Sequence, residues 1–250
     1  MHHPPQPLHV LQGAQRHVAP NTPAPTLLIA GATGVLGNEV LRRLVGSARY
    51  GQVQVLAREP VRTGIARVAL TVCPGDDPTA WPTQRADVAV VMFEPPRMFY
   101  ERERALWVPS PTTLLALSAW LKRCGVRSVA VVMPHTRGHM PLALQQGFAN
   151  LDEQAVSALG FERLVWVRSA QKPPPSARPS RGMERLRDLV LSVFSYMVPQ
   201  SQQPLRVAHV AHAVSLALQH APAGVHVVGH EQMWHASRSN MAQAASAWFS

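Results

Sequence analysis

The stretch TLLIAGATGVLG, residues 26–37, decides the fold that the sequence predicts. Residues 26–30 form an apolar run of strand length, and a glycine-rich turn follows at residues 31–37. Apolar residues then recur at helical spacing from Val35 to Leu44. A strand, a glycine turn and a helix in this order are typical of a βα unit that binds a dinucleotide. We therefore predict a cofactor-binding turn, and the alternative is a fold of the same type whose site is vacant.

Each glycine of this turn has its own expected role. Gly31 allows the chain to turn tightly, Gly34 lets the backbone approach a pyrophosphate, and Gly37 lets the helix pack closely against the strand. The first turn of the helix offers free amide N–H groups and the positive end of the helix dipole. Together these features predict a binding site for phosphate groups.

Short apolar strands alternate with helical segments along the rest of the chain. The expected strands cover residues 53–57, 68–72, 88–92, 128–133, 164–167 and 225–228, and the expected helices cover residues 114–123, 142–159, 186–197, 207–218 and 237–249. This alternation predicts an α/β fold, a Rossmann-type doubly wound parallel sheet with a small C-terminal substrate-side region. The predicted organisation is a disordered leader over residues 1–25, a dinucleotide-binding domain over residues 26–235 and a C-terminal helix or tail over residues 236–250.

Composition and charge narrow the class of protein further. The formal net charge is +10, and nearly all of the excess is arginine, since only Lys122 and Lys172 are lysines. The arginines favour a phosphate-bearing partner, but they are scattered, which argues against a nucleic-acid interface. Cys73 and Cys124 form no metal-binding or redox pair. No apolar run approaches the roughly 20 residues of a transmembrane helix, and residues 1–25 lack the pattern of a signal peptide, so we predict a cytoplasmic protein.

Five segments of the chain resemble a known family. They are GATGVLG at residues 31–37, VLAREP at 55–60, CGVRSVAVV at 124–132, GFERLVWVR at 160–168 and PLRVAHVAHAV at 204–214. In this order they resemble the atypical, extended short-chain dehydrogenases, particularly the branch of NmrA-like and Tat-interacting-protein-like NAD(P)H-binding proteins. The resemblance implies a Rossmann fold with NAD(P)(H) as its cofactor.

The resemblance also implies roles for individual residues. The phosphate loop would be formed by Gly31, Thr33, Gly34, Val35, Leu36 and Gly37. Arg58 follows the second strand, where the family often places a cation against the 2′-phosphate of NADP, so NADP(H) is favoured over NAD(H), although the neighbouring Glu59 argues the other way. Asp76 matches an acid beside the adenine, and its alternative role is that of an ordinary turn aspartate.

The chain departs from this family at the catalytic positions. The family's reaction uses a serine after the fifth strand and a Tyr-x-x-x-Lys pair, in which the tyrosine transfers the proton. None of the three tyrosines here has a lysine four residues later, and the matching positions hold Met133-Pro134, Gln145 and Ala149. His135, just after the fifth strand, is a weak candidate for a catalytic acid or base. His209 and His212 lie three residues apart on a helix, where packing explains them better than a metal.

Three functional hypotheses follow from these observations. The first is an NAD(P)(H)-binding pseudoenzyme with a cofactor-sensing, regulatory or assembly role. The second is an NADP-dependent oxidoreductase with a non-standard proton donor such as His135. The third is a cofactor-free Rossmann scaffold for protein interaction, which the bulky and acidic segment FEPP at residues 93–96 favours. The expected partners are the dinucleotide and either another protein or a second copy of this chain.

Overall fold

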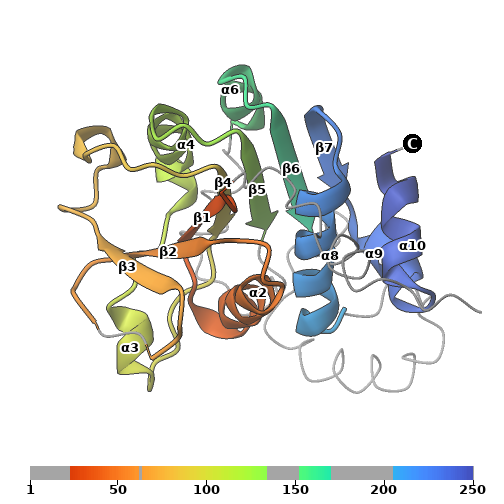
Figure 1. Ribbon diagram of the computed structural model, residues 1–250, viewed down its shortest axis with the longest axis horizontal. Helices are drawn as coiled ribbons and strands as arrows, with labels where there is room; N and C mark the ends of the chain where they lie inside the picture. The colour runs from red at the N-terminus through yellow and green to blue at the C-terminus, as the bar shows by residue number, and fades with distance from the viewer. Residues whose placement is uncertain (1–22, 62–63, 134–151, 170–204, 250) are drawn as a thin grey trace, which may run out of the picture.

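Parallel strands form a single sheet at the centre of the molecule (Figure 1). The computed structural model describes residues 23–61, 64–133, 152–169 and 205–249. In these ranges the sheet has seven strands in the order β3-β2-β1-β4-β5-β6-β7. Their bounds are Thr26–Ala30 for β1, Gln52–Ala57 for β2, Val68–Val72 for β3, Val88–Met92 for β4, Ser128–Met133 for β5, Arg163–Arg168 for β6 and Gly224–Val228 for β7.

The strand order reverses at the centre of the sheet. Leu27 of β1 pairs in parallel with Val53 of β2 on one side and with Val88 of β4 on the other. The chain therefore winds outward from β1 in one direction and from β4 in the other, which confirms the predicted doubly wound Rossmann-type sheet. In such sheets ligands bind at the carboxyl ends of the strands, next to this reversal.

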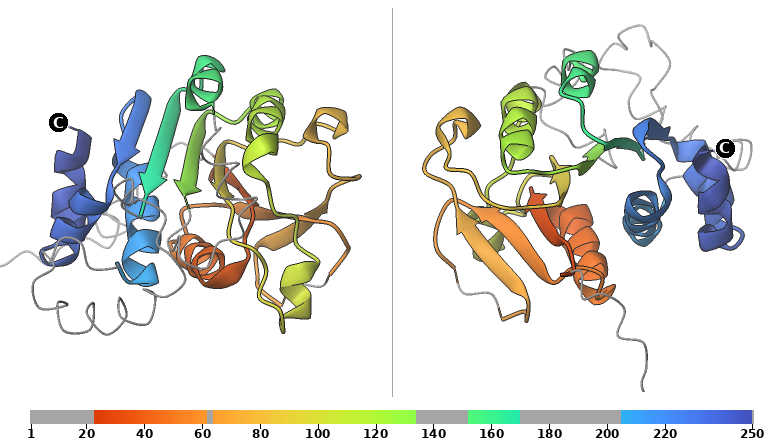
Figure 2. Two further views of the ribbon diagram at one scale, coloured as in Figure 1. Left: turned by 180° about the vertical axis from the view of Figure 1, so that it is seen from behind. Right: turned by 45° about the horizontal axis from the view of Figure 1, so that its top comes forward.

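Alternate residues of each strand enter two separate hydrophobic cores. Leu27 and Ile29 face the core beneath α2 (Gly34–Gly46) and α8 (Val207–His220), whereas Leu28 and Ala30 face the core beneath α4 (Leu114–Arg123). Figures 1 and 2 show α2 and α8 side by side, with α4 and the short helix α6 (Glu153–Ala158) on the opposite side of the sheet. Both faces of the central strands are thus covered, which explains why β1, β4 and β5 are almost wholly apolar.

Two helical predictions need correction. Of the helix predicted over residues 142–159, residues 142–151 lie outside the described residues, and α6 begins at Glu153, because the Asp152 side chain caps it by accepting the Ala155 N–H at 2.8 Å. The helix predicted over residues 237–249 begins at Met241 as α10 (Met241–Ser246), where Asn240 caps it, and the separate helix α9 (His230–Ser237) before it was not predicted. The helix predicted at residues 186–197 and residues 1–22 of the leader lie outside the described residues.

The predicted domain boundary at residue 235 falls inside α9. Met233 and Ala236 of this helix and Met241 and Ala245 of α10 are buried in the core that also contains α8. The C-terminal helices therefore pack on the same body as the sheet. A short 3-10 turn, Ala247–Phe249, follows α10.

The chain takes an unusual path after β4. Residues 94–107, which we name the crossing segment, include the short helix α3 (Glu101–Arg104) and run over the carboxyl ends of β1 and β2. Leu106 forms an antiparallel bridge with Ala57, and the Trp107 N–H donates to the Leu56 carbonyl at 3.0 Å. The Gly31 N–H donates to the Trp107 carbonyl at 3.1 Å. The crossing segment thus covers the edge of the sheet where a ligand is expected.

Candidate functional site

The glycine turn between β1 and α2 has the geometry that the sequence predicts. Gly31 and Gly34 have φ angles of +77° and +70°, a region that favours glycine. A Cβ atom on Gly31 would lie 2.0 Å from the Met92 carbonyl oxygen, and one on Gly37 would lie 2.8 Å from the Gly31 carbonyl oxygen. The tight turn and the close packing of helix on strand therefore both depend on glycine.

Gly34 has a different neighbour from the one predicted. A Cβ atom there would lie 2.3 Å from Cδ of Glu94, so the space beside this glycine holds a carboxyl group. Oε2 of Glu94 accepts the Leu36 N–H at 2.7 Å, and the Thr33 hydroxyl donates to the Glu94 carbonyl oxygen. The side chain of Glu94 therefore occupies the amino end of α2, where a phosphate was expected.

A second carboxylate approaches the same turn from α3. Oε2 of Glu103 accepts the Gly34 N–H at 3.0 Å, and its Oε1 accepts Nδ2 of Asn38 at 2.7 Å. Arg97 donates its backbone N–H at 2.9 Å and its Nε at 2.8 Å to the same carboxylate. Glu103 is only 5% exposed, so it is a buried charge with a full set of donors, as buried charges require.

The two carboxyl groups differ in their electrostatics. Burial raises the pKa of Glu94, and the amide groups of Leu36, Gly37 and Val35 only partly oppose this effect. Burial also acts to raise the pKa of Glu103, but the hydrogen bonds from Arg97 and Gly34 outweigh it and the pKa is lowered. Glu103 is therefore the firmly ionised member of the pair, and its charge raises the pKa of Glu94 further.

The dinucleotide implied by this fold does not fit the described residues as they stand. A pyrophosphate would need the amide groups of Gly34 and Leu36, which already donate to Glu103 and Glu94. It would also bring further negative charge next to two carboxylates. The roles predicted for Thr33, Val35 and the turn glycines in binding phosphate stay predictions, and they require both carboxylates to move.

Arg58 and Asp76, predicted beside the 2′-phosphate of NADP and beside the adenine, contact each other. Nη2 of Arg58 lies 3.3 Å from Oδ1 of Asp76, and both side chains are largely exposed. The same Oδ1 accepts Nε1 of Trp107 at 3.1 Å, and the backbone N–H of Arg58 donates to the Ala105 carbonyl at 2.7 Å. Asp76 is therefore more than an isolated turn residue, and it holds the end of the crossing segment. The preference for NADP(H) stays a prediction.

The predicted catalytic positions are mostly outside the described residues. Met133, at the position of the family's serine, is the last residue of β5 and is half-buried. Pro134, His135, Gln145 and Ala149 are not among the described residues. The weak catalytic role suggested for His135 therefore stays a prediction.

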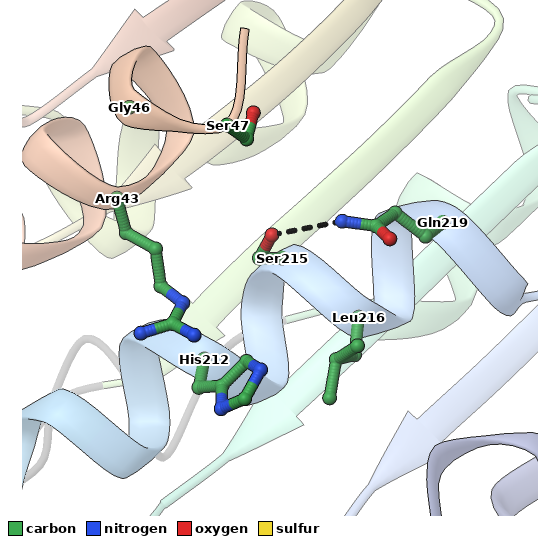
Figure 3. Close-up of a pocket in the computed structure, with 7 residues that line it drawn as sticks. All are labelled: Arg43, Gly46, Ser47, His212, Ser215, Leu216 and Gln219. Atoms are coloured by element: carbon green, nitrogen blue, oxygen red, sulfur yellow. Dashed lines mark hydrogen bonds between the residues drawn. The ribbon is translucent and has the colours of Figure 1, made fainter. Parts of the chain in front are cut away.

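A surface hollow of about 380 Å³ lies between α2 and α8 (Figure 3). Its lining residues are Arg43, Gly46, Ser47, His212, Ser215, Leu216 and Gln219. Arg43 belongs to the last turn of α2, so the hollow is remote from the glycine turn at the start of that helix. Burial lowers the pKa of His212, and the charge of Arg43 adds to this effect. In the described part of the chain no cluster of three or more metal-ligating side chains is found around His209 and His212 or elsewhere.

Sequence reasoning pointed to Glu94 but missed Glu103 and Trp107. Glu94 stands out as a carboxylate directly after a buried strand. Glu103 lies in the run ERER at residues 101–104, where it has the same local pattern as Glu101, whose side chain is 90% exposed. No signal in the sequence separates these two glutamates, because the burial of Glu103 depends on contacts with residues more than 60 positions away.

Known proteins similar to this chain are found among solved structures. No family model matches the chain, and no curated protein matches it. The solved structures similar to it include an oxidoreductase of the short-chain dehydrogenase/reductase family from Burkholderia thailandensis, with 18% identity over 83% of this chain and 91% of that one and a TM-score of 0.49. MoeE5 in complex with UDP-glucose and NAD shares 17% identity over 82% and 75%, with a TM-score of 0.48. Citrobacter sp. triphenylmethane reductase complexed with NADP(H) shares 12% identity over 80% and 68%, with a TM-score of 0.46.

The similar structures also include a nucleoside-diphosphate-sugar epimerase from Staphylococcus aureus, with 12% identity over 81% of this chain and 70% of that one and a TM-score of 0.44. The α/β fold of this chain, a parallel sheet between two layers of helices, follows from its own strand order. At these identities the similarity is one of fold, and we base no argument about ligand or activity on it. In the described residues no helix is both long and apolar enough to cross a membrane.

Proposed function

We propose that this chain is a Rossmann-fold regulatory or assembly protein that acts through protein interaction and without a bound dinucleotide. The observation that supports this proposal is the carboxylate of Glu94, which accepts the Leu36 N–H at 2.7 Å at the amino end of α2. Glu103 reinforces it by accepting the Gly34 N–H. The groups that would bind a pyrophosphate are engaged by the chain itself.

Displacing these carboxylates is costly. Glu103 is buried and accepts hydrogen bonds from Gly34, Asn38 and Arg97, and all of them would have to be given up or rearranged. Breaking a buried ion pair typically costs about 3–5 kcal/mol, which corresponds to a loss in cofactor affinity of roughly 100-fold or more. A site with a Kd of about 1 μM would thereby bind with a Kd of about 0.1 mM or weaker.

The sequence supports a non-catalytic role as well. The family's reaction needs a tyrosine with a lysine four residues later, and none of Tyr50, Tyr100 and Tyr196 has one. Tyr50 is also buried next to β2, where burial raises the pKa of its hydroxyl. The proposal is therefore that the chain is a pseudoenzyme, which lacks the proton transfer of the family's reaction. The cytoplasmic location predicted from the sequence is also part of the proposal.

Calorimetric titration of the full chain with NADPH and NADH tests the proposal. We expect no binding of either cofactor at micromolar concentration, and no turnover of aldehydes, ketones or quinones. The matched control is Gly34→Asp, which abolishes any binding that does depend on the glycine turn. Micromolar binding by the wild type that is lost in this variant would refute the proposal.

A second candidate function is that of an NAD(P)(H)-binding sensor whose cofactor displaces Glu94. The positive φ angles of Gly31 and Gly34 favour it, because they preserve a turn suited to close phosphate approach. In this case Arg58 would make NADPH bind more tightly than NADH, and Arg58→Ala would remove the difference. Turnover that disappears in His135→Ala would instead support an NADP-dependent oxidoreductase.

A further inference from the structure

We propose that the crossing segment, residues 94–107, is an internal ligand that fills the whole adenosine-diphosphate part of the dinucleotide groove. This inference rests on the proposed function and extends it from the glycine turn to the ends of β2 and β3. The contacts of the segment fall into three groups, and each group takes the place of one part of the dinucleotide.

Glu94 at the start of the segment and Glu103 in α3 supply two anionic groups at the amino end of α2. Cδ of Glu94 lies 2.3 Å from the position of a Cβ on Gly34, so the carboxyl group uses the space that the glycine leaves free. Glu103 brings a second carboxylate to the amide of the same glycine at 3.0 Å. Two carboxylates on the first N–H groups of a helix match the charge and hydrogen-bonding of a diphosphate.

Residues 105 and 106, just after α3, cover the carboxyl end of β2 with their backbone. The Arg58 N–H donates to the Ala105 carbonyl at 2.7 Å, and Leu106 bridges to Ala57. These contacts include the backbone of Arg58, the residue for which the family resemblance implies a place beside the 2′-phosphate of NADP. The backbone of the segment thus takes the hydrogen-bonding groups at this edge of the sheet.

The end of the segment supplies a flat nitrogen heterocycle. The indole of Trp107 is 2% exposed, and its Nε1 donates to Oδ1 of Asp76 at 3.1 Å. Its ring packs edge-on against Trp81, with 4.9 Å between ring centroids. Asp76 is the residue for which the family resemblance implies a place beside the adenine. An indole that donates an N–H to this carboxylate is a chemical substitute for an adenine ring.

Contacts inside the segment hold it in the shape that these interactions require. Arg97 binds Glu103 through its backbone and its side chain, and its guanidinium lies 3.6 Å from the centroid of the Tyr100 ring. A ligand that is already ordered loses little conformational entropy when it binds. The segment is therefore a preorganised ligand that is covalently attached to its own site.

Chemical rescue with inorganic pyrophosphate tests this proposal. Removing the Glu94 side chain in Glu94→Ala should vacate part of the anion site, so that millimolar pyrophosphate raises the Tm of this variant by several degrees, about 3–5 °C. The matched control is Glu101→Ala. It removes an exposed carboxylate of the same segment, whose Oε1 lies 3.9 Å from Nη2 of Arg104. We expect shifts below about 1 °C for the control and the wild type at matched ionic strength.

A second variant and a second probe complete the test. Glu94→Ser also vacates the space beside Gly34 but keeps a small polar side chain, so it provides a second variant if Glu94→Ala does not fold, and it should show the same response to pyrophosphate. With Trp107 in place, ADP should stabilise these variants no more than pyrophosphate does. ADP that is clearly more effective would show that the adenosine half is open and would overturn that half of the proposal.

The remaining outcomes separate this inference from the proposed function. If the wild type fails to bind NADPH and the Glu94 variants fail to respond to pyrophosphate, the internal-ligand proposal is wrong and the cofactor-independent function stands. If the wild type binds NADPH at micromolar concentration, the proposed function is wrong. An equal response of the wild type, Glu101→Ala and the Glu94 variants to pyrophosphate would also overturn the internal ligand, because the effect would not depend on the vacated site.

Discussion

The substitution Glu103→Ala should destabilise the protein strongly. This carboxylate is 5% exposed and accepts hydrogen bonds from Gly34, Asn38 and Arg97. Its removal leaves the Gly34 amide without an acceptor and the guanidinium of Arg97 without its partner. Because the side chain of Arg97 is 36% exposed and regains some hydration, we take the lower end of the range for a broken buried pair, about 3 kcal/mol.

Urea unfolding measures this loss of free energy directly. Thermal unfolding provides a second measure, because for a domain of this size a loss of about 3 kcal/mol corresponds to a decrease in Tm of roughly 6–12 °C. The control is Glu101→Ala, which leaves the rest of α3 unchanged. It should alter the unfolding free energy by less than about 0.5 kcal/mol. A loss below about 1 kcal/mol in Glu103→Ala would refute the idea that Glu103 fixes the crossing segment on the glycine turn.

The pH dependence of this loss has a definite sign. The pKa of Glu103 is lower in the folded protein than in the unfolded chain. Its contribution to stability is therefore complete above the unfolded pKa, near 4.3, and is lost as the pH falls through the folded pKa. The difference between the wild type and Glu103→Ala should accordingly be constant near neutral pH and shrink in acid.

Three further predictions concern the same fold. Gly31→Ala should prevent folding or cost more than about 3 kcal/mol, because its Cβ would lie 2.0 Å from the Met92 carbonyl oxygen; soluble yield and thermal unfolding measure this, and a variant as stable as the wild type would contradict it. Burial raises the pKa of Glu94 in the folded protein. The free energy of unfolding should therefore decrease as the pH rises from the pKa of the unfolded chain to that of the folded protein. In unfolding experiments Glu94→Gln should lack this decrease. Asp152→Ala should cost about 1 kcal/mol by removing the cap of α6, and urea unfolding that detects no change would count against the cap.

The strands could be predicted because they are buried on both faces. Residues 88–92 and 128–133 are continuous apolar runs, as expected for parallel strands covered by helices on both sides. The turn at residues 31–37 could be predicted as well, because its glycines are required by positive φ angles and close packing. These signals are local in the sequence.

The rest of the site depends on contacts that no local pattern records. α9 was missed because its sequence HEQMWHAS is mostly polar and buries few side chains. Glu103 and Trp107 were missed because their partners, Gly34 and Asp76, lie 69 and 31 positions away. The segment FEPP at residues 93–96 predicts an obstacle near the site, but no local pattern specifies where the Glu94 carboxylate lies.

The crossing segment has a consequence for how this fold is maintained in a cell. A free cofactor stabilises its protein only in proportion to its concentration relative to Kd. The carboxylates of Glu94 and Glu103 are attached to the same chain as the amide groups that they meet, so their effective concentration is fixed by the length and stiffness of the connection. Dilution, starvation or a change in redox state does not alter it. By our proposal, the stability of the glycine turn does not depend on the supply of nucleotides.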